Sequence, residues 1–85
     1  MAEDISYYAI VNDFSTRERP GGVLRRIQHV QGQRDEAFTS DLTWEHSPLL
    51  YAYERGDLTN RLIPITEDEA MAIVDRIRRE VGASG

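Results

Sequence analysis

The clearest pattern of apolar positions lies near the C-terminal end of the chain. From Ala70, apolar side chains recur three, four, seven and eleven positions along, which is the spacing of one stripe on an α-helix. Thr66 and Glu69 form a capping box, in which each side chain satisfies a backbone N–H at the helix start. Gly82 is a typical stop signal. The pattern predicts an amphipathic helix between Thr66 and Gly82, with its apolar stripe packed against another element.

Three upstream segments have the patterns of strands. Residues 5–12 are rich in aromatic and β-branched side chains, and residues 23–30 form a second such run. In residues 37–45 the side chains alternate, so that Phe38 and Trp44 fall on the same face. Each segment is therefore predicted to be a strand of one sheet.

The connections between these strands indicate how they pair. Residues 13–22 end in the sequence Pro-Gly-Gly, which is typical of a type II turn or of a longer hairpin loop. Gln31 and Gly32 can close a tight connection between the second and third strands. Short connections between successive strands predict an antiparallel meander.

A short helix and a further strand are predicted before the long helix. Ser47 is expected to cap this short helix, Pro48 occupies its first position and Gly56 stands at its C-terminal end. Residues 58–65 have the composition of a fourth strand. Because Pro64 has no N–H to donate to a ladder, that strand is expected at a sheet edge or to end there.

This order of elements predicts a single α+β domain over residues 1–85. Its sheet is small and antiparallel, with a three-stranded meander and a possible fourth strand. The short helix and the C-terminal amphipathic helix are expected on one face, and the opposite face, with Tyr8, Arg26 and Gln28, is expected to be open to water. The predicted core consists of Val11, Val23, Ile27, Phe38, Leu42, Trp44, Leu50, Ile73, Val74 and Ile77.

Composition narrows the range of functions. The 85 residues include no cysteine, which excludes disulfides and thiolate metal sites, and the formal net charge is −5. That charge argues against non-specific binding to nucleic acid or anionic lipid. No stretch reaches the roughly 20 apolar residues that span a bilayer, and the acidic start is unlike a signal peptide. We therefore expect a cytoplasmic protein that does not bind membranes.

Charge is unevenly distributed along the chain. Five arginines and one acidic residue lie in residues 14–34, whereas six acidic residues and one arginine lie in residues 35–57. Three interpretations follow: pairing between neighbouring strands of opposite sign, docking of a basic hairpin on a partner protein, or contact with phosphate or nucleic acid, which the acidic neighbours oppose. If the segment binds a partner, the candidate binding residues are Tyr8, Arg17, Arg19, Arg25 and Arg26.

Candidate chemistry is sparse. His29 and His46 would need a third ligand such as Glu45 or Asp35 to hold a metal, and the spacing matches no known metal motif. The serines lack a strand-turn-helix nucleophile elbow. We therefore expect no catalytic residue, no metal site and no cofactor.

The whole-chain pattern resembles that of small uncharacterised actinobacterial proteins. The resemblance rests on the tyrosine-rich first strand, the Arg-Arg pair of the second, the Asp-Glu-Ala-Phe and Leu-Thr-Trp segments, and the closing Ile-Thr-Glu. It implies a GC-rich bacterial source and a stand-alone protein, and it assigns no activity and no functional residue.

Taken together, these patterns favour a non-enzymatic protein–protein interaction module. One alternative is a small enzyme or ligand-binding protein with a shallow site near His29 and His46. Another is a weak nucleic-acid-binding sheet face around Tyr8 and Arg26, because aromatic and arginine side chains can stack on bases. Because like-charged molecules repel, we expect a monomer rather than a homodimer.

Overall fold

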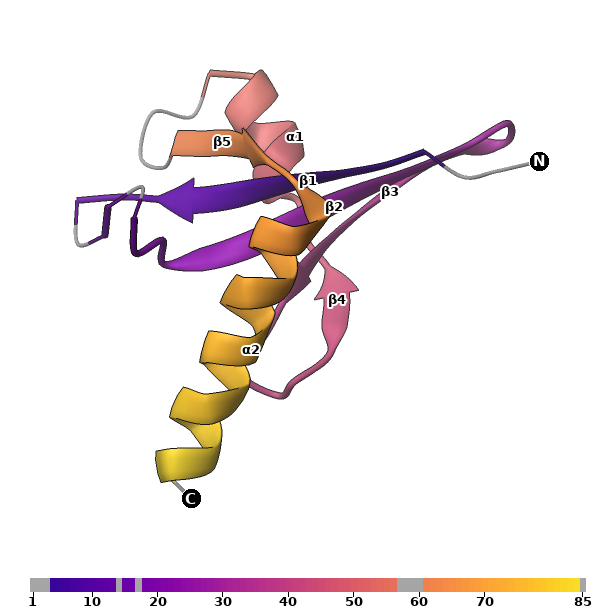
Figure 1. Cartoon of the computed structure of the whole chain (residues 1–85). Coiled ribbons are helices and arrows are strands. Elements are labelled where there is room, and N and C mark those ends of the chain that lie inside the picture. The colour runs from indigo at the N-terminus through magenta and orange to yellow at the C-terminus, as the bar shows by residue number, and fades with distance from the viewer. Residues whose placement is uncertain (1–3, 14, 17, 57–60, 85) are drawn as a thin grey trace.

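The computed structural model describes residues 4–13, 15–16, 18–56 and 61–84 (Figure 1). Within these ranges the chain forms five strands and two α-helices. In chain order they are β1 (Asp4–Val11), β2 (Gly22–His29), β3 (Gly32–Phe38), β4 (Trp44–His46), α1 (Leu49–Glu54), β5 (Arg61–Ile65) and α2 (Glu67–Ser84). The predicted α+β class is confirmed.

The strands form one antiparallel sheet with the order β4-β3-β2-β1-β5. The meander therefore has four strands rather than the three predicted, and β5 returns to pair with β1 on its other side. The expected edge strand is confirmed, since β5 lies at a sheet edge and contains Pro64. Its predicted first residues, 58–60, lie outside the described part of the chain.

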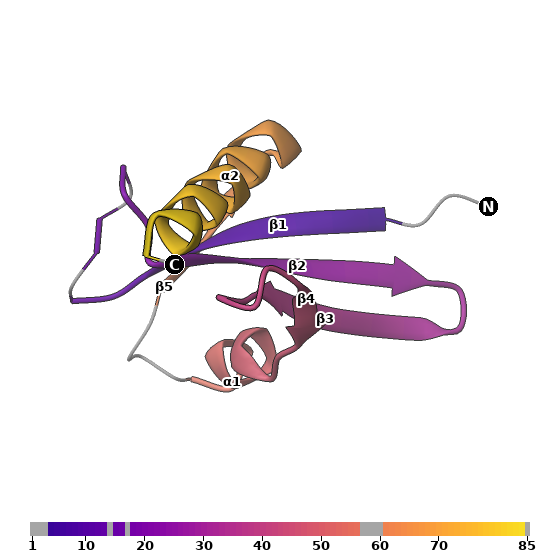
Figure 2. The same ribbon diagram turned by 90° about the horizontal axis from the view of Figure 1, so that it is seen from below.

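The two helices cover opposite faces of the sheet (Figure 2). Val23 and Leu24, which are adjacent on β2 and both fully buried, point to opposite faces. Val23 belongs to the cluster that includes Ile73 and Val74 of α2, whereas Leu24 packs with Leu50 of α1. The expectation that both helices share one face and leave the other open to water is therefore wrong.

The third predicted strand is interrupted by a turn. β3 ends at Phe38, and the N–H of Leu42 donates to the carbonyl of Thr39 at 2.9 Å before β4 begins at Trp44. Leu42 adopts a φ of +64° and is 39% exposed, so its assignment to the core is wrong. Leu42 fits the alternation predicted for residues 37–45 only by coincidence, because a turn separates it from β3.

The rest of the predicted core is largely confirmed. Buried residues of that prediction are Val11, Val23, Ile27, Phe38, Leu50, Ile73 and Val74. Trp44 and Ile77 are partly buried and pack against the α2 side. Buried apolar residues that the pattern missed are Tyr7, Ala9, Leu24, Leu62 and Ala70. Leu24 and Leu62 belong to the cluster beneath α1, on the face that was expected to be open, whereas Tyr7, Ala9 and Ala70 extend the cluster beneath α2.

Local capping signals were predicted well at helix starts. The Thr66 N–H donates to Glu69 Oε1 at 3.0 Å and the Glu69 N–H donates to Thr66 Oγ1 at 3.2 Å, which confirms the capping box. The start predicted for α1 is wrong by one residue, because Pro48 is the N-cap and Leu49 the first helical residue, although Ser47 Oγ accepts from the Leu49 N–H at 3.2 Å.

The two predicted stop signals differ in outcome. Gly56 follows α1 with a φ of +107°, a conformation that favours glycine, and so confirms the predicted end. Gly82 does not end α2, which continues to Ser84.

The loop before β2 is the longer hairpin connection of the two alternatives. Among the described residues, the glycines with positive φ are Gly32 and Gly56, so Gly21 does not form the type II turn. Instead, the N–H of Gly21 donates to the carbonyl of Ile10 at 2.8 Å. The next connection is tight, since the His29–Gly32 pair encloses a two-residue turn.

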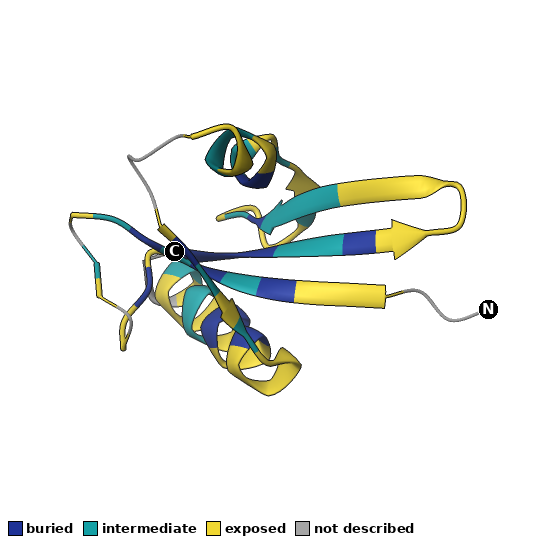
Figure 3. Ribbon diagram, turned by 90° about the horizontal axis from the view of Figure 1, so that it is seen from above, coloured by how far each residue is buried: buried dark blue, intermediate teal, exposed yellow. Residues whose placement is uncertain are grey.

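Strands β1, β2 and β3 extend together beyond both helices (Figures 2 and 3). We define the arm as residues 4–6 and 28–34. All of these residues are exposed, including Val30 at the turn, which is 86% exposed. The molecule therefore has a sandwiched part, where helices cover the sheet, and a part where both faces meet water.

Candidate interaction surface

Arg25 and Arg26 lie opposite acidic partners on the neighbouring strand. In the β2–β3 register Arg25 faces Glu36 and Arg26 faces Asp35. Arg25 Nε donates to Glu36 Oε1 at 2.8 Å, and Arg26 Nε donates to Asp35 Oδ1 at 2.7 Å. The interpretation that the segregated charges pair between neighbouring strands is confirmed for these residues.

Arg26 is held further by the helix above it. Its Nη1 and Nη2 atoms each donate to a different carboxylate oxygen of Glu54 on α1, both at 2.9 Å. The hydrogen bonds to Asp35, and after them those to Glu54, raise the pKa of Arg26, and the hydrogen bonds from Arg26 lower the pKa of Glu54. The Arg26 side chain is only 11% exposed. Because it binds both Asp35 on β3 and Glu54 on α1, it attaches α1 to the sheet.

Arg25 occupies the opposite face in a similar arrangement. Its guanidinium carbon lies 4.3 Å from the ring centroid of Trp44, which is a cation–π contact. Glu36 binds Arg25 and also Arg34, whose Nε lies 3.1 Å from a Glu36 oxygen. These charges compensate one another within the fold.

The other candidate binding residues are dispersed. Tyr8 packs against the cluster under α1, on the same face as Arg26. Arg19 is 75% exposed and pairs with Glu80 of α2 at 3.1 Å. Arg17 lies outside the described residues. The described members of the predicted set therefore do not form one continuous surface.

The two histidines are also separate. His29 ends β2 opposite Gly32, whereas His46 ends β4 opposite Glu36. Gly32 and Glu36 are four residues apart on β3, a separation of roughly 13 Å along a strand. Among the described residues, no group of three or more His, Asp or Glu side chains could hold a metal ion.

The arm carries an open strand edge. N–H and C=O groups of successive residues in an antiparallel strand point to alternate sides. The Ile10 carbonyl bonds toward β2, so Ser6, four positions away, also points to β2 and Ile5 points to the other side. There β5 ends opposite Tyr7. No described strand therefore pairs with the N–H and C=O of Ile5.

The turn at the end of the arm supports this assignment. A two-residue hairpin turn is closed by a hydrogen-bonded pair, here His29 with Gly32. It follows that Ile27 also bonds toward β3, and that Arg26 and Gln28 bond toward β1. The alternation set by the His29–Gly32 pair is therefore the same as that set by the Ile10 carbonyl.

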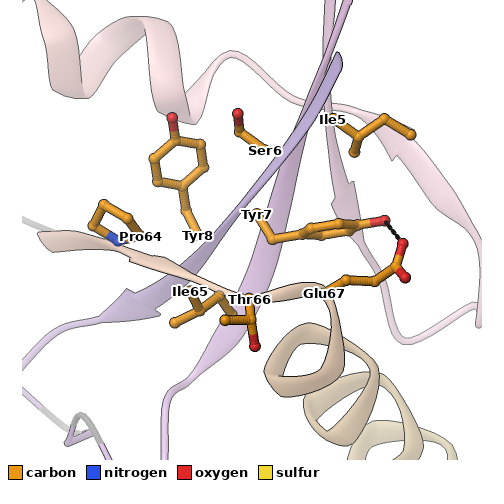
Figure 4. Close-up of a pocket in the computed structure, with 8 residues that line it drawn as sticks. All are labelled: Ile5, Ser6, Tyr7, Tyr8, Pro64, Ile65, Thr66 and Glu67. Atoms are coloured by element: carbon orange, nitrogen blue, oxygen red, sulfur yellow. Dashed lines mark hydrogen bonds between the residues drawn. The ribbon is translucent and has the colours of Figure 1, made fainter. Parts of the chain in front are cut away.

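A hollow adjoins this open edge (Figure 4). It has a volume of about 500 Å³ and lies between β1, the end of β5 and the start of α2. Its lining residues are Ile5, Ser6, Tyr7, Tyr8, Pro64, Ile65, Thr66 and Glu67. The hollow thus combines apolar and aromatic surface with one carboxylate.

Tyr7 and Glu67 form the contact across this hollow. The hydroxyl of Tyr7 donates to Glu67 Oε2 at 3.4 Å, as drawn in Figure 4. Burial, and then the nearby negative charge of Glu67, raise the pKa of Tyr7. The phenol is therefore neutral at physiological pH and holds Glu67 beside the open strand.

The outer edges of the sheet are better protected than the arm. On β5, Ile63 and Ile65 pair with β1 through the same alternation, so Leu62 and Pro64 point outward. Pro64 removes the donor at its position, which is a common protection of edge strands. β4 has three residues and offers a short edge.

Sequence reasoning missed this site for an identifiable reason. In the sequence, Ile5 is the first residue of a predicted strand and Glu67 lies in the first turn of the predicted helix, where an acid commonly complements the helix dipole. The eight-residue β1 extends past the described part of β5, which has five residues, but the predicted strands, residues 5–12 and 58–65, are equally long, so the sequence pattern did not reveal the open edge. Its position depends on the register, which the sequence pattern did not give.

Searches of protein-family models, curated proteins and solved structures found no match to this chain. The resemblance to small actinobacterial proteins therefore stays a prediction. In the described part of the chain, neither helix is both long and apolar enough to cross a membrane.

Proposed function

We propose that the protein is a non-enzymatic protein–protein interaction module and that the arm is its contact surface. The observation that carries the proposal is the unpaired edge of β1 at Ile5 beside the hollow. Exposed strand edges bind other chains readily, and natural proteins usually protect them. Within the part of the chain that the structure describes, no strand or proline covers this edge at Ile5, whereas the outer edge of β5 carries Pro64.

Exposed apolar residues on the arm also support the proposal. Ile5 is 41% exposed and Val30 is 86% exposed. Ile5 lies at the open backbone edge and Val30 at the turn of the same arm, which suits an interface in which a partner supplies the missing ladder and covers exposed apolar side chains.

The alternative functions have less support. An enzyme with a site near His29 and His46 would need these side chains together, and they lie at the ends of different strands. A nucleic-acid-binding face would need Tyr8 and Arg26 to be open, yet they lie on the face that α1 covers. Location in the cytoplasm and a monomeric state stay predictions.

A display library of random peptides tests the proposal. The whole protein should enrich binders, and these should lose affinity for a variant with Val30→Asp and Ile5→Ser on the arm. As a matched control, Tyr51→Ser removes another exposed apolar side chain, 55% exposed on α1, and should retain binding. Absence of enrichment, or binders that ignore the arm variant, would contradict the proposal.

A further inference from the structure

We infer that the open edge of β1 binds an extended, basic segment of another protein, which adds as a strand beside Ile5. This inference rests on the proposed function and names the partner's chemistry. The added segment would lie in the hollow between β1 and the start of α2, with its basic side chain toward Glu67.

The backbone geometry defines where the segment runs. β5 pairs with β1 as far as the Tyr7–Ile65 pair, and then Thr66 directs the chain into α2. A strand from another chain can continue the line of β5 past this point. This strand would accept a hydrogen bond from the Ile5 N–H and donate one to the Ile5 C=O. No strand among the described residues pairs with these two groups.

The charges around this path select a basic segment. Asp4 precedes Ile5, and Glu67 and Asp68 lie in the first turn of α2; all three are exposed. Arg25 is the positive group whose charge acts on Tyr7, where it lowers the pKa of the phenol. Arg25 is already paired with Glu36. A lysine or arginine of the segment would meet carboxylates that form no ion pair with the residues the structure describes, which favours association.

The same charges disfavour a second copy of this chain as the occupant. Two β1 edges paired antiparallel about Ile5 would bring Asp4 and Glu67 of each copy toward the other. The net charge of −5 on each molecule adds to this repulsion. A different, basic protein is therefore the occupant that the surface fits.

A capped hexapeptide that alternates lysine and valine is a suitable probe, with a glutamate–valine hexapeptide as its charge control. Titration into ¹⁵N-labelled protein should shift the amides of Ile5 and the hollow with the lysine peptide and slow hydrogen exchange of the Ile5 N–H. The glutamate peptide should cause no such shifts.

The matched variants are Ile5→Pro and Gln33→Pro. Proline at position 5 removes the outward N–H without removing a hydrogen bond to β2, and should weaken peptide binding about tenfold, as expected for one ladder hydrogen bond. Gln33 points away from β2 on the other arm edge, because Asp35 bonds toward Ser47, so Gln33→Pro should leave binding unchanged.

A charge variant keeps the test valid if Ile5→Pro does not fold. Glu67→Lys should weaken binding of the lysine peptide and favour the glutamate peptide. Equal shifts by both peptides, absence of shifts, or binding lost with Gln33→Pro but kept with Ile5→Pro would overturn the inference. A dimer that Ile5→Pro dissociates would identify a second copy as the occupant and also overturn it. In each case, library binders that still map to the arm would leave the proposed function standing.

Discussion

Arg26 and Asp35 lie directly opposite one another on β2 and β3 and form a two-point ion pair. Arg26 Nε donates to Asp35 Oδ1 at 2.7 Å and Nη2 donates to Oδ2 at 3.1 Å. Both side chains are 11% exposed. Because the same guanidinium also binds Glu54 of α1, one arginine joins two strands and a helix.

We therefore expect Arg26→Gln to destabilise the fold by about 3 kcal/mol, near the low end for breaking a buried pair, because it leaves Asp35 without its partner. Arg34→Gln removes an arginine that pairs with Glu36 on the same strand, β3, but is 56% exposed, and should cost less than about 1 kcal/mol. Urea unfolding of both variants measures the difference. Equal midpoints for the two variants would contradict the assigned role of Arg26.

The attachment of α1 should depend on pH through Glu54. Hydrogen bonds from Arg26 lower the pKa of this carboxyl in the folded state. A lowered pKa gives a stabilisation that is complete above the ordinary glutamate value and is lost as the pH falls through the folded-state value. NMR titration of the Glu54 carboxyl should give a pKa below the ordinary range in the wild type. In Arg26→Gln it should return toward that range, and an unchanged value would argue against this pairing.

The stability lost when a core side chain is truncated to alanine should increase with the burial of that side chain. Leu24 is fully buried, so Leu24→Ala should cost about 2–5 kcal/mol. Ile77 is only partly buried, so Ile77→Ala should cost about 1–2 kcal/mol, in proportion to the apolar area it covers. Chemical denaturation of the two variants checks this order. A larger loss for Ile77→Ala would place it at the centre of the core, as the helical stripe alone predicts.

Pro64 should limit self-association through β5. Pro64→Ile restores an outward N–H on an edge that also contains Leu62 and Ile63, so we expect concentration-dependent association, seen by light scattering. Pro64→Lys restores the same N–H with a charge that opposes edge pairing, and should stay monomeric. Association of the lysine variant to the same extent would show that charge does not protect this edge.

The sequence predicted features that depend on neighbouring residues. The capping box of Thr66 and Glu69 and the position of Gly56 need only a few residues of chain, and both were correct. Pairing between strands of opposite charge was one of the three interpretations of the charge distribution, and the structure shows it for Arg25 and Arg26. Such features can be predicted from the sequence because the residues that interact are close in the chain or lie on adjacent strands.

Features that depend on which elements meet were harder to predict. Tyr7 and Tyr8, like Val23 and Leu24, are adjacent apolar residues that a half-buried strand does not need. Such pairs are typical of strands covered on both faces, and they were the signal for the second helix layer. The open edge at Ile5 required the β1–β5 register, in which residue 7 meets residue 65.

The position of β1 in the sheet has a consequence for how the chain folds as it is synthesised. β1 lies between β2 and β5, so it obtains its second neighbour only after most of the chain has left the ribosome. Until then the layer beneath α2 lacks Ala70, Ile73 and Val74, and the layer beneath α1 lacks Leu62. The early hairpins can form locally, but pairing of β1 with β5 closes a long loop and is expected to be slow. A nascent chain stopped after α1 would therefore present to chaperones the sheet face that α2 later covers and the edge of β1 that β5 later pairs.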